Sequence, residues 1–343
     1  MKRSIRRTAR LAGGLIPVAI LAGVLSAPSG AMAGPGSSRS ACGSAWRLVG
    51  SPSPGTLANG LDKIIALSPT DAWAVGSKLH GEIETSALVE RYDGSAWSEA
   101  RSPLVDEAAL LDVDGTSARD VWAVGTVWGV GRILIEHYDG SRWTRVSAPM
   151  LDTDYVQLGA VDAISPMDVW AAGYFLDRAT GVYRNLVSHY DGVAWSLVEA
   201  PALGRGDNQL FDLAAVNADN VWVVGHAFHQ GRFHPLAMPF TGRKWRVVTA
   251  PDGGSGDSSL YAIAAGPNGT MRAVGSGTDG TGVARTLAEY YRDSAWIATA
   301  TPNASAEENE LWSVAISPEG DVWAVGDYNP HSLGQTLTEH LCP

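Results

Sequence analysis

Positive charge is in short supply in this sequence. Its 343 residues include 25 Lys and Arg against 36 Asp and Glu, which gives a formal net charge of -11. Removal of residues 1–33, which carry five basic residues and no acidic ones, makes the remainder still more acidic. Phosphate backbones and anionic headgroups repel such a surface. The composition therefore disfavours nucleic acid and membrane surfaces as partners and leaves cations, neutral glycans and basic proteins.

Long hydrophobic runs are also lacking. The apolar segment from Leu11 to Leu25 is short for a membrane span, follows a basic segment and precedes Ala31-Met32-Ala33, which has the pattern of a cleavage site. We interpret it as part of a cleaved secretion signal. Arg6-Arg7 also permits twin-arginine export, but the polar Arg10 favours ordinary secretion. The expected organisation is a signal peptide, a short flexible segment and one folded domain: residues 1–33, 34–41 and 42–343.

Helical periodicity is absent after residue 33, and so are G-x-S-x-G, H-E-x-x-H and phosphate-binding glycine motifs in a fitting context. What replaces them is a repeat. The string Asp-Ala-Trp-Ala-Val-Gly at 71–76 recurs with small changes, at starting positions 48 to 52 residues apart: 120, 168, 220, 270 and 321. Six copies of a unit of about 50 residues indicate a repeat architecture.

Each copy carries a second landmark. Tyr92-Asp93-Gly94-Ser95-Ala96-Trp97 recurs at 138–143 and 190–195 and is degenerate at 240–245 and 291–296. Asp-Gly between apolar runs is a strong hairpin signal. Each unit therefore reads as four antiparallel strands, so we predict an all-β, six-bladed β-propeller. Most of the tryptophans occupy repeat positions and are interpreted as packing between blades.

The last copy ends before its fourth strand, and that strand is found at the other end of the chain. Cys42-Gly43-Ser44-Ala45-Trp46 matches the Asp-Gly-Ser-x-Trp hairpin, and Cys42 and Cys342 both align with Asp93. The N-terminal strand is thus expected to complete the last blade, in a one-plus-three closure. Because the two cysteines divide one tight turn, we predict a disulfide between them in place of a metal or catalytic thiol.

The Asp-Gly-Ser-x-Trp hairpins resemble the Asp-box hairpins of BNR-type propellers, without the Ser or Thr that normally precedes the Asp. The complete unit resembles the kelch-like repeats of secreted actinobacterial propellers, over all of residues 42–343. That resemblance implies a secreted protein that binds a glycan or a protein. Sialidases share the blade number, but the sequence has no Arg-Ile-Pro motif, so sialidase activity is not expected.

Positions that depart from the repeat are candidates for function. The first strands of blades two to four together carry four aspartates at variable positions that are expected to face the channel: Asp112, Asp114, Asp162 and Asp212. Carboxylate oxygens suit Ca²⁺, so a calcium site is one hypothesis. The other is a water-filled channel that Lys63 partly neutralises. Four glutamates at one position of the third strand are interpreted as solvated or locally paired: Glu90, Glu136, Glu289 and Glu339.

Aromatic residues gather in the connections between the second and third strands. They are Trp128, Tyr174, Phe175, Tyr183, Phe228, Phe233 and Tyr328. Such rings can stack on sugars, or they can simply cover strand ends. Three histidines of the fourth blade, His226, His229 and His234, raise the question of zinc, but His226 and His229 are expected to point to opposite faces of a strand.

The leading hypothesis is therefore a secreted, monomeric binding module without a required cofactor, whose partner is an extracellular glycan or protein. Two alternatives remain. One is a polysaccharide hydrolase or lyase that uses channel aspartates such as Asp114 and Asp162. The other is a structural or assembly component.

Overall fold

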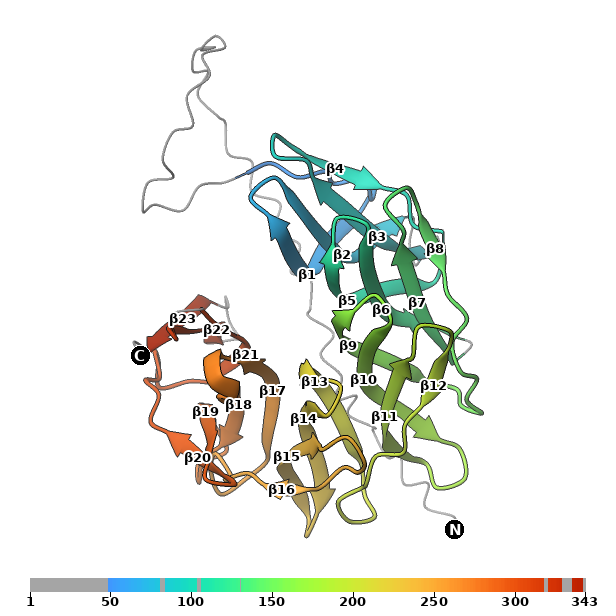
Figure 1. The fold of residues 1–343 in the computed structure, drawn as a ribbon. Helices are drawn as coiled ribbons and strands as arrows, with labels where there is room; N and C mark the ends of the chain where they lie inside the picture. Colours follow the sequence, from blue (N-terminus) through green and yellow to red (C-terminus); the bar gives the residue numbers. More distant parts are fainter. Residues whose placement is uncertain are drawn as a thin grey trace, which may run out of the picture. The chain divides into compact units, whose positions relative to one another are not determined.

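The six copies of the repeat fold into six small antiparallel sheets. In the computed structural model, which describes residues 49–80, 84–103, 106–129, 131–317, 320–328 and 335–341, five sheets have four strands and the sixth has three. The sheets follow one another in chain order around a central space, from blue to red in Figure 1. The chain is a six-bladed β-propeller, as the repeats predict.

All of the strands lie in the unit formed by residues 50–343. The strands of blades one to three are β1 (Ala58–Ser68), β2 (Asp71–His80), β3 (Glu84–Tyr92), β4 (Trp97–Ala100), β5 (Ala108–Ser117), β6 (Asp120–Val127), β7 (Arg132–Tyr138), β8 (Trp143–Arg145), β9 (Val156–Ser165), β10 (Asp168–Asp177), β11 (Val182–Tyr190) and β12 (Trp195–Leu197). Those of blades four to six are β13 (Asn208–Asn217), β14 (Asn220–His229), β15 (Arg232–Phe240), β16 (Val248–Thr249), β17 (Ser258–Ala265), β18 (Met271–Thr278), β19 (Ala284–Arg292), β20 (Ala295–Thr299), β21 (Asn309–Ile316), β22 (Val322–Tyr328) and β23 (Gln335–Leu341). A short 3-10 helix spans Pro267–Gly269. Over the described ranges, no helix has the length and apolarity needed to cross a membrane.

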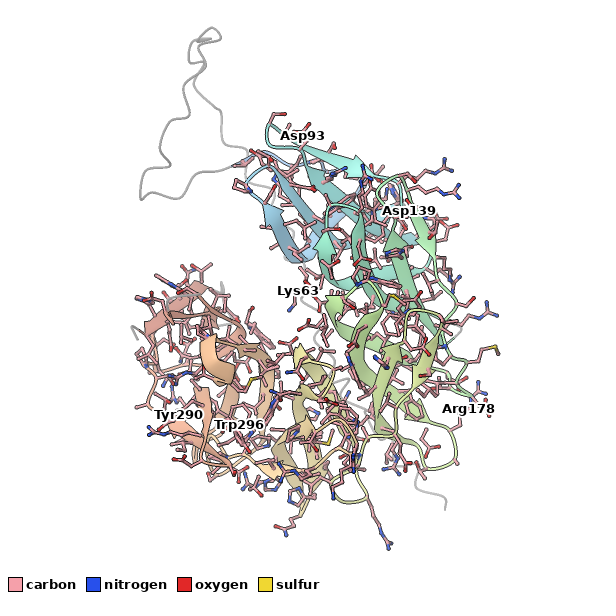
Figure 2. All side chains as sticks on the ribbon, in the orientation of Figure 1. Lys63, Asp93, Asp139, Arg178, Tyr290 and Trp296 are labelled. Carbon is pink, nitrogen blue, oxygen red and sulfur yellow. The ribbon has the colours of Figure 1, made fainter. Side chains whose placement is uncertain are left out.

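The first strands of the blades lie innermost, and each contacts the first strand of the next blade from β1 through to β21. The tight Asp-Gly hairpins between the third and fourth strands form as expected. Asp93 accepts hydrogen bonds from the backbone N–H groups of Ser95 at 2.8 Å and Ala96 at 3.0 Å, while Gly94 adopts a φ of 93°. The hydrogen bond from the Ser95 hydroxyl, followed by these two backbone bonds, lowers the pKa of Asp93 to about 2. Asp139 has the same role in blade two, and Figure 2 labels both.

Tryptophans join neighbouring blades. Trp73 in the second strand of blade one meets Trp143, which begins the fourth strand of blade two, at 5.3 Å and 82°. Trp122 and Trp195 repeat the contact at 5.6 Å, and Trp222 and Trp296 repeat it at 5.6 Å. Edge-to-face pairs of this kind add about 0.5–1.5 kcal/mol each beyond the area they bury. The structural role expected for these residues agrees with this packing.

Each innermost strand contains a β-bulge that the sequence did not reveal. A glycine in the second strand faces the carbonyl of the first strand so closely that a Cβ on Gly225 would lie 1.9 Å from the oxygen of Gln209. At the same point the register slips, so that Leu210 pairs with Gly225 and Asp212 with Val224. The residues that the six bulges leave unpaired are Asp62, Leu111, Gly159, Phe211, Tyr261 and Trp312. A bulge re-aims the side chain of its extra residue.

Of the two interpretations of the third-strand glutamates, solvated or locally paired, burial rules out the first for three of them. Glu90 and Glu136 are 0% exposed and Glu289 is 1% exposed, because this position faces the neighbouring blade. Glu136 accepts a hydrogen bond from the Ser102 hydroxyl of blade one at 2.8 Å. Burial raises the pKa of Glu289 to about 8, with a smaller contribution from the charge of Asp252.

The predicted closure falls on residues outside the described ranges. These include Cys42, Cys342 and Trp46, so the disulfide and the N-terminal fourth strand of blade six stay predictions. Trp323 of blade six is 48% exposed, whereas Trp73 at the same repeat position is 1% exposed and packs against Trp143 of the next blade.

Candidate functional site

The four channel aspartates bind the backbone of the next blade. Asp112 accepts the N–H of Val161 at 2.8 Å and Asp114 accepts that of Ala163 at 2.7 Å. Asp162 and Asp212 do the same, each at 2.8 Å, with the N–H groups of Ala215 and Ile263. Each carboxylate therefore clips one innermost strand to its neighbour, a role that nothing in the repeat pattern indicated.

Burial also shapes the charge of this channel. It raises the pKa of Asp112 to about 7 and that of Asp162 to about 7, with nearby carboxylates adding to the effect. Lys63, labelled in Figure 2 on the inner strand of blade one, has a raised pKa because Asp212 and Asp112 favour its charged form. The described ranges contain no group of three or more His, Cys, Asp or Glu placed to hold a metal ion. These carboxylates thus act as inter-blade clips, and the calcium site stays a hypothesis.

The aromatic residues of the strand connections do not form one surface. Tyr174 is buried at 3% exposure, and its neighbour Phe175 packs on the opposite side of β10 against the core between blades two and three. Tyr328 packs into the core between blades five and six. Trp128 is half-buried, and its backbone N–H donates to the carbonyl of Glu107 at 2.7 Å. Of these five residues, Phe228 is the most exposed, at 38%, with its ring 5.2 Å from Phe233.

A different set of aromatic residues comes together at the bulges. Phe211 lies 5.7 Å from Tyr261, and Tyr261 stacks on Trp312 at 4.5 Å and 24°. These three rings, which we call the aromatic arc, occupy the same repeat position in blades four, five and six. Phe211 also meets Tyr174 of blade three edge-on at 6.2 Å. Trp312 is 45% exposed, so the arc ends in an open indole surface.

Polar groups continue around the same end of the innermost strands, where they form a hydrogen-bonded belt. Its members are Tyr155, Gln157, Tyr174, Gln209, His226, Ser259, Tyr261, Ser276 and Glu310. The Tyr155 hydroxyl donates to Gln157 at 2.8 Å, and Ser276 donates to Glu310 at 3.0 Å. Blades one and two carry small residues at the matching positions, such as Gly60 and Ala109. The site is therefore confined to blades three to six.

His226 is the central link of this belt and is held neutral. Its ring nitrogens lie 2.8 Å from the hydroxyl of Ser259 and 2.9 Å from Oε1 of Gln209, and its ring stacks on Phe233 at 4.1 Å. Burial lowers its pKa to about 3. The other two histidines considered for zinc, His229 and His234, contact each other with their ring centroids 3.9 Å apart and their planes tilted by 40°. His226 thus belongs to the belt, whereas His229 and His234 contact each other.

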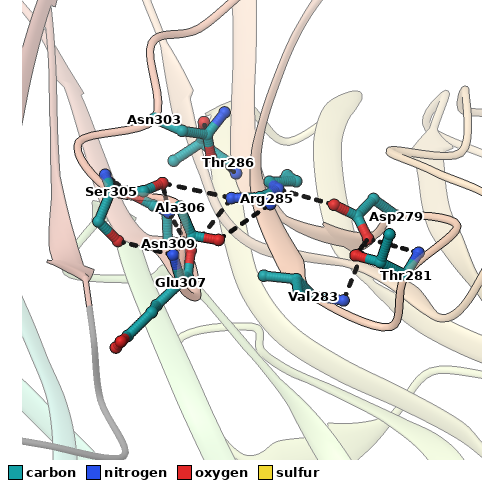
Figure 3. Close-up of polar contacts among 10 residues, drawn as sticks. All are labelled: Asp279, Thr281, Val283, Arg285, Thr286, Asn303, Ser305, Ala306, Glu307 and Asn309. Atoms are coloured by element: carbon teal, nitrogen blue, oxygen red, sulfur yellow. Dashed lines mark hydrogen bonds and ion pairs between the residues drawn. The ribbon is translucent and has the colours of Figure 1, made fainter.

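An arginine clamp organises the loop that leads into the site. Arg285 of β19 donates to Asp279 at 2.9 Å and to the carbonyls of Ala306 at 3.1 Å and Glu307 at 3.1 Å, as Figure 3 shows. Asn309, which begins β21, donates to the Glu307 carbonyl at 2.6 Å. Since β21 carries Glu310 and Trp312, the clamp positions the exposed end of the arc.

A separate cavity of about 340 Å³ lies between blades five and six. Its lining includes Arg272, Val274, Thr301, Leu337 and Glu339. Arg272 stands where blades one to four carry tryptophans that meet the fourth-strand tryptophan of the next blade. We therefore expect the predicted fourth strand of blade six to pack at this cavity, as the fourth-strand tryptophans do in blades two to five.

Chemically, the arc offers a stacking surface with the half-buried carboxylate of Glu310 on the same strand, while the amide of Gln209 and the imidazole of His226 are buried and support it. Such a combination can hold a ligand that has apolar faces and a hydroxyl-bearing rim. The sequence held one signal for the arc. The residue that follows the first-strand leucine changes to Phe211, Tyr261 and Trp312 in three successive copies, but only the bulges show that these rings meet.

Comparisons with known proteins show the fold. The chain matches no protein-family model and no curated protein. Among solved structures it is similar to the PL25 ulvan lyase, a polysaccharide lyase bound to -[GlcA(1-4)Rha3S]-, with 10% identity, a TM-score of 0.52, and coverage of 85% of this chain and 81% of that one. It is also similar to YCF48 bound to D1 peptide, with 15% identity, a TM-score of 0.39, and coverage of 64% of this chain and 60% of that one. A third is the extracellular domain of BT4673 from B. thetaiotaomicron, with 11% identity, a TM-score of 0.36, and coverage of 79% and 38%.

Proposed function

We propose that this chain is a secreted binding module that holds an extracellular glycan at the aromatic arc. The observation that carries the proposal is the exposed indole of Trp312, backed by Tyr261 at 4.5 Å on one face. A pyranose ring presents apolar C–H faces that suit such a surface. The ring and its support come from three neighbouring blades, so the platform is rigid before a ligand arrives.

The hydrogen-bonded belt supports the same function. Sugar hydroxyls need donors and acceptors beside the stacking surface, and the half-buried carboxylate of Glu310 lies on the same strand as Trp312. Gln209, Ser259 and Ser276 are buried, so they support the strands of the arc from within the protein. Each belt member already has a partner within the protein, which fixes its orientation. Binding in place of catalysis is favoured because Asp114 and Asp162, the residues considered for acid–base chemistry, hold backbone N–H groups of neighbouring blades.

The test is binding of soluble polysaccharides by the intact protein, followed by tryptophan fluorescence and calorimetry. Trp312→Ala is expected to weaken binding at least about 10-fold, since a central aromatic anchor typically contributes 1.4 kcal/mol or more. Leu197→Ala is the matched control, because Leu197 lies on the outer strand β12 and is 46% exposed, close to the 45% of Trp312.

Both variants should unfold at temperatures close to the parent. If Trp312→Ala binds every polysaccharide as the parent does, or if the parent binds none, the proposal is wrong. Binding of a protein partner in place of a glycan would instead support the second class of partner that the sequence permits, an extracellular protein.

A further inference from the structure

The row of aromatic rings continues beyond Phe211 into blade three. Phe211 meets Tyr174 of β10 edge-on at 6.2 Å. The ring of Tyr174 lies 6.0 Å from that of Tyr155 and 5.4 Å from that of Tyr183, and the last two rings also meet each other at 6.0 Å and 78°. These three tyrosines, which we call the tyrosine cluster, lie near the connection between β10 and β11, within the continuously described range 131–317.

Two rings of the tyrosine cluster are partly open, and the third supports them. Tyr174 is 3% exposed, whereas Tyr155 and Tyr183 are half-buried. The Tyr155 hydroxyl donates to Oε1 of Gln157 at 2.8 Å. The backbone N–H of Tyr183 donates to the carboxylate of Asp207, which precedes β13 of blade four, also at 2.8 Å. These hydrogen bonds hold both open residues in place before a ligand arrives.

Together, the aromatic arc and the tyrosine cluster form one row of rings that spans blades three to six. Neighbouring rings in this row lie 4.5 to 6.2 Å apart. The row is open at its blade six end, where Trp312 is 45% exposed, and it opens again at Tyr155 and Tyr183 in blade three. The half-buried rings of Phe211 and Tyr261 lie between these two ends. The row thus offers two stacking surfaces that are separated by blades four and five.

We infer that this row binds an extended oligosaccharide segment, with one sugar ring on Trp312 and a later one on the tyrosine cluster. The inference rests on the function proposed above. A pyranose ring is similar in size to an aromatic side chain, so a disaccharide on Trp312 leaves the cluster unoccupied. In a longer chain held at Trp312 the second contact becomes intramolecular, and the affinity rises without any stronger individual contact. The ligand is therefore a segment of several sugars within a glycan chain, not a single sugar.

Affinity measured against chain length tests the inference. The parent is titrated by calorimetry with oligosaccharides of two to eight units prepared from β-glucan, xylan and mannan, beside the intact polymers. For a polymer that binds, the dissociation constant should fall at least about 10-fold from the disaccharide to the longest oligosaccharide. The length at which it falls reports the span between the two ends of the row.

Substitutions of Tyr183 separate the two ends of the row. Tyr183→Ala removes an open ring, so it should weaken binding of the longest oligosaccharide at least about 5-fold and leave binding of the shortest ligand unchanged. Tyr183→Phe keeps the ring and should bind every length as the parent does. Tyr92→Ala is the matched control, because Tyr92 is also half-buried but lies at the opposite end of the third strand, in blade one. Trp312→Ala should weaken binding at every length.

The outcomes distinguish this inference from the proposed function. Equal affinity for short and long oligosaccharides would overturn the extended site and leave glycan binding at Trp312 in place. The same holds if Tyr183→Ala binds the longest oligosaccharide as the parent does, or loses affinity equally at all lengths. Binding of none of the oligosaccharides or polymers would overturn both proposals.

Discussion

Asp162 of blade three accepts the backbone N–H of Ala215 of blade four at 2.8 Å, across 53 residues of sequence. The same clip joins Asp112 to Val161 and Asp212 to Ile263. Adjacent innermost strands of a propeller do not pair through a full ladder. A side-chain acceptor that reaches the neighbouring backbone therefore satisfies a donor that burial would otherwise leave costly.

The hydrogen bond from Asp162 to the next blade predicts that two substitutions of this residue differ in their effect on stability. Asp162→Asn keeps an acceptor oxygen and should leave the protein close to the parent in stability. Asp162→Ala leaves the N–H of Ala215 without its acceptor and should cost about 1–3 kcal/mol. Urea denaturation followed by tryptophan fluorescence measures both. An equal loss of unfolding free energy in the two variants would show that the hydrogen bond does not contribute to stability at this position.

Glu289 predicts a pH dependence of stability. Burial raises its folded pKa to about 8 from the ordinary value of 4.5, so the folded state holds a proton that the unfolded state releases between these two values. The bound proton of Glu289 contributes fully to the free energy of unfolding below pH 4.5. This contribution is lost as the pH rises toward 8, at up to about 1.4 kcal/mol per pH unit. Glu289→Gln should therefore stabilise the protein at pH 8 and change little at pH 4.

Thermal melts across this pH range test the prediction, with Glu136→Gln as a comparison. Glu136 occupies the same repeat position but accepts a hydrogen bond from Ser102. If Glu289→Gln raised the melting temperature equally at pH 4 and pH 8, the assignment of the titration to Glu289 would be contradicted.

The clamp at Arg285 predicts a local effect on the loop before β21. Arg285→Ala removes donors from Asp279 and from the carbonyls of Ala306 and Glu307. Amide exchange in the segment 305–310 should become at least several-fold faster, and binding at the arc should weaken. Arg292→Ala, at a position 71% exposed in side chain, is the control. Unchanged exchange in the segment would show that the loop is held by other contacts, such as those of Asn309.

The predicted ring closure can be tested through the cysteines and through the cavity between blades five and six. Cys42 and Cys342 should resist maleimide in the unreduced protein and react after reduction. Loss of the bond in Cys42→Ser should cost up to about 6 kcal/mol, the ceiling that loop entropy sets for a link across the whole chain. Trp46→Ala should lower the melting temperature with the disulfide intact, because Trp46 is expected to fill the cavity beside Arg272. Modification of both thiols without reduction would refute the closure.

The architecture could be predicted because its signals are local. Asp-Gly turns such as Asp93-Gly94 determine hairpins within a few residues, and alternation around Trp73 or Trp122 determines which face of a strand is buried. A repeated unit then specifies the same blade six times. Residues 1–33 and the two cysteines lie outside the described ranges, so secretion and closure stay predictions from sequence.

The candidate site could be predicted only in part. Asp112, Asp114, Asp162 and Asp212 were assigned to the channel, and the structure places them on the innermost strands, but their backbone partners lie about 50 residues away. Tyr174 and Phe175 were grouped by nearness in sequence, although successive residues of a strand point to opposite faces. Side chains that are neighbours along the chain were therefore separated by the fold.

By itself, the sequence determined the six blades, their strands and the tryptophan packing between them, because hydrogen-bonded turns and alternating burial depend on neighbouring residues. Only the tertiary structure decided that Phe211, Tyr261 and Trp312 form one arc and that carboxylates clip one blade to the next. Those contacts depend on bulges that turn side chains at the inner edge and on the placement of adjacent blades. Neither can be read from a repeat whose copies are 48 to 52 residues apart.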